Sequence, residues 1–138
     1  MDRLRPTYLR IMLILMFMIA YFYGVLLWAG VRNSANAGRA VAAGVCLLVA
    51  LSGNLLGKAR RNFYIGARTP WSLADERVWN KTHRLAAKTL VMGGMTGLAL
   101  SAVGVEGWAI PAALIVGAII PAVYSLIYYK QLERRGEL

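Results

Sequence analysis

Residues 11–30 read IMLILMFMIAYFYGVLLWAG, an apolar run of twenty residues that contains no charged side chain. A helix rises 1.5 Å per residue, so a run of this length spans about 30 Å, the thickness of the hydrocarbon core of a bilayer. Three further runs of similar length follow at 40–57, 85–104 and 108–129. The sequence therefore predicts an all-α, polytopic membrane protein, with residues 1–138 forming a single membrane domain folded as a four-transmembrane-helix bundle.

The composition agrees with burial in lipid. Hydrophobic residues make up 59% of the chain, whereas a soluble domain has roughly 45–50%. This excess excludes an ordinary soluble enzyme. The single cysteine, Cys46, excludes an intramolecular disulfide and a multi-cysteine metal site.

The first apolar run also has to be compared with a signal peptide, because basic residues precede it and Ala35-Asn36-Ala37 imitates a cleavage site. A signal core is about 7–15 residues long, shorter than this run. In addition, Arg32 stands between the run and the cleavage-like site. We therefore expect a retained transmembrane helix.

The connections between the runs predict the topology. Residues 31–39 and 105–107 form short connections, and residues 58–84 form a long one, which shares its side of the membrane with both termini. Three basic residues precede the first run, seven fill the long segment and three follow the last run, against Arg32 and Arg39 on the other side. The positive-inside rule then predicts that both termini and the long segment are cytoplasmic. The net charge of +10 needs no nucleic acid to explain it.

Small residues recur at four-residue spacing in three of the runs, and such stripes let helix backbones approach one another in lipid. The stripes are Cys46, Ala50, Gly53 or Asn54, and Gly57 in the second run, Gly93, Gly97 and Ser101 in the third, and Ala113, Gly117 and Pro121 in the fourth. They predict close packing within the bundle and could equally form a homodimer face.

The stretch from Gly53 to Arg84, GNLLGKARRNFYIGARTPWSLADERVWNKTHR, differs from the generic spans. Its Asn54 lies about one turn from the end of the second run, where an unpaired amide is costly. We expect Asn54 to point into the bundle and to bond a neighbour, either as an interhelical clamp or as part of a site.

A cytoplasmic interfacial helix is predicted between the second and third spans. Thr69-Pro70 has the pattern of a cap followed by proline in the first turn, and Ser72 with Asp75 offers an alternative start. The helix would begin at residue 70 or 73 and run towards, or into, the third span.

On this helix, spacing separates two faces. Arg77, Lys81, Arg84 and Lys88 form a basic stripe, and Asp75, Trp79 and His83 are spaced by four on roughly the opposite face. A carboxylate near the imidazole would orient it and make His83 a proton-transfer group or a hydrogen-bond donor. The alternative is that Trp79 and His83 simply pack against the end of the bundle.

At these residues the sequence resembles the SdpI family of bacterial integral membrane proteins. The resemblance rests on Gly53-Asn54, Arg61-Asn62 with Gly66, Arg68-Thr69-Pro70-Trp71, Val78-Trp79 and Lys81-Thr82-His83-Arg84. It implies a location in the bacterial plasma membrane and immunity to a secreted toxic peptide. It also implies a signalling role in which a cytoplasmic regulator is held at the membrane. The chain resembles a short form, because the additional N-terminal helices of the family's namesake are not evident.

Two functions are compatible with these residues. In the first, an immunity protein recognises a toxic peptide through its cytoplasm-side motif. In the second, a membrane-interface protein or enzyme binds a lipid headgroup, with Arg68 and Arg84 holding an oxyanion and His83 handling a proton. The candidate ligand-binding residues are Asn54, Arg61, Asn62, Arg68, Thr69, Trp71, Asp75, Trp79, His83 and Arg84.

The sequence favours a binding protein over an enzyme. It holds one histidine and neither a carboxylate pair nor a recognisable nucleophile motif, so we assign no catalytic residue. We likewise predict no metal and no cofactor, because a single histidine makes a weak metal ligand and a poor haem site. The expected partners are membrane lipids and a toxic peptide.

Overall fold

The structure is a computed structural model that describes residues 5–32, 36–57, 66, 69–105 and 107–137. Within these residues every regular element is a helix. The elements are α1 (Arg5–Arg32), α2 (Ala37–Leu56), α3 (Pro70–Ala74), α4 (Glu76–Ala102) and α5 (Ala109–Arg134). All except α3 are long and apolar enough to cross a membrane, so the predicted all-α, multi-pass membrane fold is confirmed.

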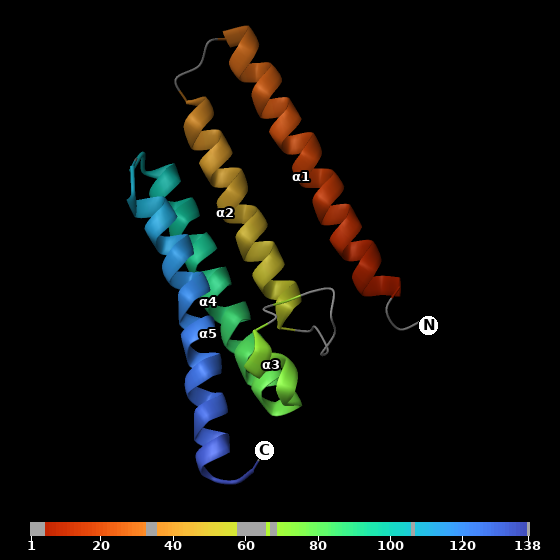
Figure 1. The fold of residues 1–138 in the computed structure, drawn as a ribbon. Coiled ribbons are helices and arrows are strands. Elements are labelled where there is room, and N and C mark those ends of the chain that lie inside the picture. Colours follow the sequence, from red (N-terminus) through yellow and green to blue (C-terminus); the bar gives the residue numbers. More distant parts are fainter. Residues whose placement is uncertain (1–4, 33–35, 58–65, 67–68, 106, 138) are drawn as a thin grey trace.

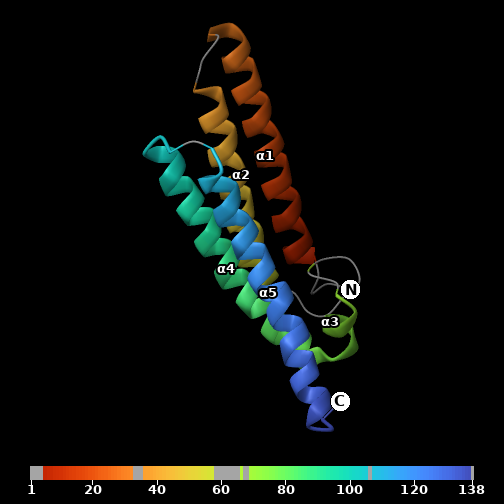
Figure 2. The ribbon, with the colours of Figure 1, turned by 60° about the vertical axis from the view of Figure 1, so that its left-hand side comes forward.

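Helix α4 is the centre of the arrangement. It packs against both α2 and α5, which make little contact with each other, and α1 packs against α2. Figures 1 and 2 show the long helices running antiparallel, with the start of α1, the end of α5 and the short α3 at one end of the molecule. The predicted common side for the long segment and the termini is thus the end that carries α3.

Glycines allow the backbones of α4 and its neighbours to touch. A Cβ atom at Gly93 would lie 2.8 Å from the carbonyl oxygen of Ala113 in α5, and one at Gly94 would lie 2.6 Å from the carbonyl oxygen of Cys46 in α2. These distances leave no room for a side chain. Gly93 belongs to a predicted small-residue stripe, so this stripe forms contacts within the chain, one of the two alternatives that the sequence left open.

A proline inside α5 creates a further contact between the helices. Pro121 lacks a backbone N–H, so the carbonyl of Gly117, four residues earlier, has no donor within α5. Thr89 of α4 fills this place, because its Oγ1 donates to the Gly117 oxygen at 2.7 Å. A Cβ at Gly117 would lie 2.9 Å from the Thr89 carbonyl oxygen, so only glycine permits this approach.

Helix α1 is the least packed of the long helices. Only Met18 and Val25 are buried among its described side chains, and Phe17 and Ile19 are 62% and 69% exposed. The Tyr21 hydroxyl donates to the carbonyl oxygen of Ala40 at 2.8 Å and ties α1 to α2. The apolar side chains that α1 exposes are those that lipid covers in a spanning helix.

The interfacial segment forms two helices, a short α3 that begins at a predicted start and α4, which runs on into the third span. Thr69 caps α3 by accepting from the backbone N–H of Ser72 at 3.3 Å, which agrees with a start at residue 70 and not with the alternative start at 73. Asp75 then has an extended backbone (φ −132°, ψ 134°) and its carboxylate accepts from the N–H of Arg77 at 2.7 Å, so a new helix begins. Helix α4 has 27 residues and is about 40 Å long. It therefore starts well outside the predicted span and carries the candidate motif on its first turns.

Candidate functional site

The end of the bundle near α3 contains a buried cluster of mixed polarity. Trp79 is completely buried and His83 is 1% exposed, although both lie in the first turns of α4. Ser72 of α3, Thr82 of α4 and Ser125 of α5 are also fully buried. Three helices thus converge on one cluster, which joins parts of the chain that are more than 50 residues apart.

Trp79 and His83 form the centre of this cluster. Their rings stack with centroids 3.9 Å apart and an interplanar angle of 19°. The Nδ1 atom of His83 lies 2.9 Å from the carbonyl oxygen of Trp79. A carbonyl can only accept, so Nδ1 carries the proton, and in the neutral ring Nε2 is the acceptor.

Gly66 closes the cluster on the Nε2 side of the imidazole. Its φ of +119° lies in the region that favours glycine, and a Cβ added there would collide with His83 Nε2. The glycine that the family resemblance includes is thus needed for close approach to the histidine.

Trp71 connects α3 to α5. Its indole Nε1 donates to Ser125 Oγ at 2.7 Å, and that hydroxyl donates to the carbonyl oxygen of Ala122 at 2.6 Å. Thr69 contributes through its cap on α3. These two predicted site residues therefore position the segment that covers the cluster.

Of the two alternatives for His83, orientation by the Asp75 carboxylate is not the one that the described residues show. The Asp75 carboxylate instead bonds the backbone N–H and the guanidinium of Arg77, with a side-chain distance of 3.1 Å. Helical spacing does not apply to Asp75, because its backbone is extended and its carboxylate caps the first turn of α4. The bond to the Arg77 guanidinium holds the pKa of this carboxyl below its usual range.

The expectation that Asn54 points into the bundle is also wrong, because its side chain is exposed. The preceding residue, Gly53, faces α4 instead, where a Cβ would lie 2.8 Å from the Cβ of Leu90. Successive residues of a helix are turned by about 100°. Packing of the glycine against α4 therefore turns Asn54 away from it.

His83 and Arg84 meet at a pocket of about 260 Å³, which Gly57 and Asn80 also line. Arg84 is exposed, while His83 is buried. Asn80 is absent from the predicted site, although it precedes Arg84 by four residues on α4 and helical spacing could have identified it. An amide, an imidazole and a guanidinium at one opening can bind a polar or anionic group.

The remaining predicted residues, Arg61, Asn62 and Arg68, lie outside the described residues and stay predictions. Among the described residues, no group of three or more His, Cys, Asp or Glu could hold a metal ion. Thr82 Oγ1 is buried and has no hydrogen-bond partner among the described residues. The described part of the site is thus a packed aromatic and polar core with one basic side chain at its edge.

Comparison with known proteins places this motif in a family. The model of the SdpI/YfhL protein family matches residues 58–125, which include α3, α4 and the first part of α5. The chain is 37% identical over 94 residues to a Bacillus subtilis (strain 168) protein named immunity protein SdpI, a match that covers 65% of this chain and 44% of that relative. No solved structure matches the chain significantly. The chain belongs to the SdpI/YfhL protein family.

Proposed function

We propose that this protein confers immunity to a secreted toxic peptide on the bacterium that carries it. The observation that carries the proposal is the 37% identity over 94 residues to a protein named for immunity. The family match includes the Trp79–His83 stack and the pocket residues Asn80 and Arg84. Because the matched stretch covers 44% of that relative, the activity of the whole relative is carried over here as a proposal.

The orientation of the protein in the membrane is inferred from the distribution of its basic side chains. The described side chains at the α3 end include exposed basic residues on both neighbouring helices, among them Arg77, Lys81 and Arg84 on α4 and Lys130 and Arg134 on α5. Basic residues flank spans on the cytoplasmic side. In this proposal the protein lies in the bacterial plasma membrane, with both termini and the buried cluster towards the cytoplasm.

The described contacts suggest how the site works. The stack with Trp79 holds the ring of His83, which lines the pocket, and the Trp71–Ser125 bond holds α3 to α5. Arg84 then presents a guanidinium at the pocket edge, where it can hold a carboxylate of a peptide. The motif therefore acts as a preformed binding surface that needs no chemical step.

The test is protection of a sensitive bacterium. The full chain is expressed in cells that lack immunity, and growth is measured over a range of toxin concentrations. We expect survival with the wild-type chain, loss of survival with Arg84→Ala, and no change with Lys88→Ala, which removes a charge one turn away on the same stripe. Failure of a well-expressed wild-type chain to protect would contradict immunity, and equal protection by Arg84→Ala would contradict a role for the pocket.

A second candidate function is binding of a lipid headgroup at the same pocket, either for recognition or for an enzymatic step. It is favoured by the shared position of His83 and Arg84 at one opening of about 260 Å³. Native mass spectrometry would detect an anionic lipid that is retained by the wild-type chain and lost in Arg84→Ala. Retention of the same lipid by this variant would argue against the second function.

A further inference from the structure

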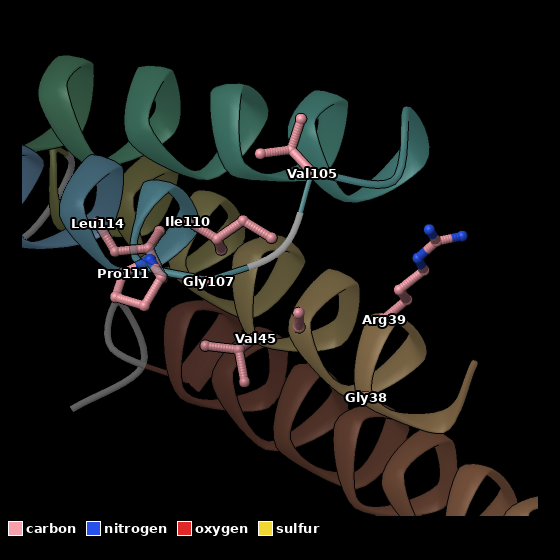
Figure 3. A pocket seen from close by; sticks show the side chains of 9 residues that line it. Gly38, Arg39, Val45, Val105, Gly107, Ile110, Pro111 and Leu114 are labelled. Carbon is pink, nitrogen blue, oxygen red and sulfur yellow. The ribbon is translucent and has the colours of Figure 1, made fainter. Parts of the chain in front are cut away.

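A larger pocket lies at the opposite end of the molecule from the Trp79–His83 stack. It has a volume of about 580 Å³ and lies between the first half of α2 and the start of α5 (Figure 3). The α4–α5 turn completes it with Val105 and Gly107. Helices α2 and α5 make little contact with each other, since α4 packs against both, so the space between them stays open.

The lining of this pocket is apolar except at one end. Ala42 and Val45 of α2 face Ile110, Pro111 and Leu114 of α5, and none of these side chains has a polar atom. Arg39 is the charged residue of the lining. The pocket therefore combines an apolar wall with one positively charged side chain.

The positions of these residues along α2 match the depth profile of one leaflet. Gly38 and Val45 mark the two ends of the pocket wall on α2 and lie about 10 Å apart along the helix axis at 1.5 Å per residue. One leaflet contributes about half of the ~30 Å of hydrocarbon. Arg39 is in the first turn of α2, at headgroup level, and the apolar wall extends from there into the region of the acyl chains.

Arg39 is held at this level by the end of α4. Its guanidinium donates to the Gly104 carbonyl oxygen at 3.4 Å, and its own carbonyl oxygen accepts from Ser101 Oγ at 3.1 Å. A Cβ at Gly104 would lie 2.5 Å from the guanidinium, so glycine makes room for it. The side chain remains exposed and lines the pocket.

We propose that this pocket binds one anionic phospholipid, with its phosphate at Arg39 and one acyl chain between α2 and α5. The distribution of charge favours a lipid over a peptide helix, because Arg39 lies at the end of an otherwise apolar wall. A phospholipid has the same arrangement, with an anionic phosphate at the end of its acyl chains. The proposal concerns the end opposite the candidate site and does not rest on the immunity function.

The test uses the full chain in mixed micelles that contain equal amounts of phosphatidylglycerol and phosphatidylcholine, with bound lipid counted by native mass spectrometry. Arg39→Gln removes the charge but keeps a donor for the Gly104 carbonyl. Ala42→Phe fills the pocket and leaves the charge in place. Lys130→Gln, an exposed position at the other end of the molecule, removes the same charge as a matched control, and circular dichroism confirms that each variant is helical.

We expect the wild-type chain and Lys130→Gln to retain phosphatidylglycerol about fivefold over phosphatidylcholine, the effect of one basic residue near a membrane surface. Arg39→Gln should bring this ratio close to one, and Ala42→Phe should reduce retention of both lipids several-fold. An unchanged ratio in Arg39→Gln would overturn the proposal even if Ala42→Phe failed to fold. Unchanged lipid retention in Ala42→Phe together with loss of toxin protection would also overturn it, because the pocket would then be a peptide site.

Discussion

The contact between Thr89 and Gly117 offers a sharp test of how this bundle is held together. Pro121 deprives the Gly117 carbonyl of its donor within α5, and Thr89 Oγ1 supplies one from α4 at 2.7 Å. Substitution Thr89→Val keeps the shape of the side chain and removes the donor. The carbonyl then has neither its intrahelical partner nor its partner on α4.

The expected loss in the free energy of unfolding is moderate. Leaving a buried acceptor unsatisfied costs about 1–3 kcal/mol in soluble proteins, while side-chain hydrogen bonds between membrane helices average about 0.6 kcal/mol and reach about 1.7 kcal/mol. We expect Thr89→Val to lower the free energy of unfolding by about 1 kcal/mol. In a Pro121→Ala background the restored N–H of residue 121 bonds the Gly117 carbonyl, so the same substitution should cost close to zero.

The assay is a double-mutant cycle measured by unfolding in detergent titrations followed by circular dichroism. The coupling between Thr89 and Pro121 should be about 1 kcal/mol. Thr96→Val, at an exposed position of α4, is the control and should not destabilise the protein. The reasoning is refuted if Thr89→Val costs the same with and without Pro121, since the hydrogen bond would then have nothing to do with the missing N–H.

Three further predictions concern the α3 end. Gly66→Ala should destabilise the protein by about 1–3 kcal/mol, because of the positive φ of Gly66 and the collision with His83 Nε2. In a His83→Ala background, detergent unfolding should show a smaller loss of stability, and an equal loss of stability would mean that the collision plays no part. Trp71→Phe removes the bond to Ser125 and should cost about 1 kcal/mol in the same measurement, so an unchanged stability would show that α3 is held by packing alone. Asp75 has a lowered pKa because of its bond to Arg77, so its stabilising contribution is present above about pH 4 and is lost as the pH falls further. Asp75→Asn should flatten this pH dependence of unfolding. A profile identical to that of the wild-type chain would contradict a stabilising role for the Asp75 carboxylate.

The length and hydropathy of the apolar runs predicted the helices well. Each of the four runs corresponds to a long helix, and the Thr69-Pro70 pattern predicted the start of α3. These features are local, because helix length and capping depend on residues that are close in sequence. The small-residue stripes left open whether they pack within the chain or between two copies, and the structure shows close contacts within the chain at Gly93, Gly97 and Gly117.

The arrangement of the candidate site was predicted only in part. Trp79 and His83 share a helix face at four-residue spacing, and the structure stacks them. Asp75 has the same spacing but bonds Arg77, because the chain leaves the helix at this residue. Asn54 is exposed, because the choice between it and Gly53 for the face towards α4 depends on close packing with Leu90.

The sequence by itself determined that this chain crosses a membrane with four helices and that its distinctive polar motif lies between the second and third. Those properties follow from hydropathy and from residue order, which need no knowledge of distant contacts. Only the tertiary structure decided that Trp71 reaches Ser125, that Gly66 lies against His83 and that Thr89 donates to the Gly117 carbonyl, which Pro121 leaves without its donor in α5. Each pair joins parts of the chain that helix periodicity alone does not bring together, and glycine permits the close approach at Gly66 and at Gly117.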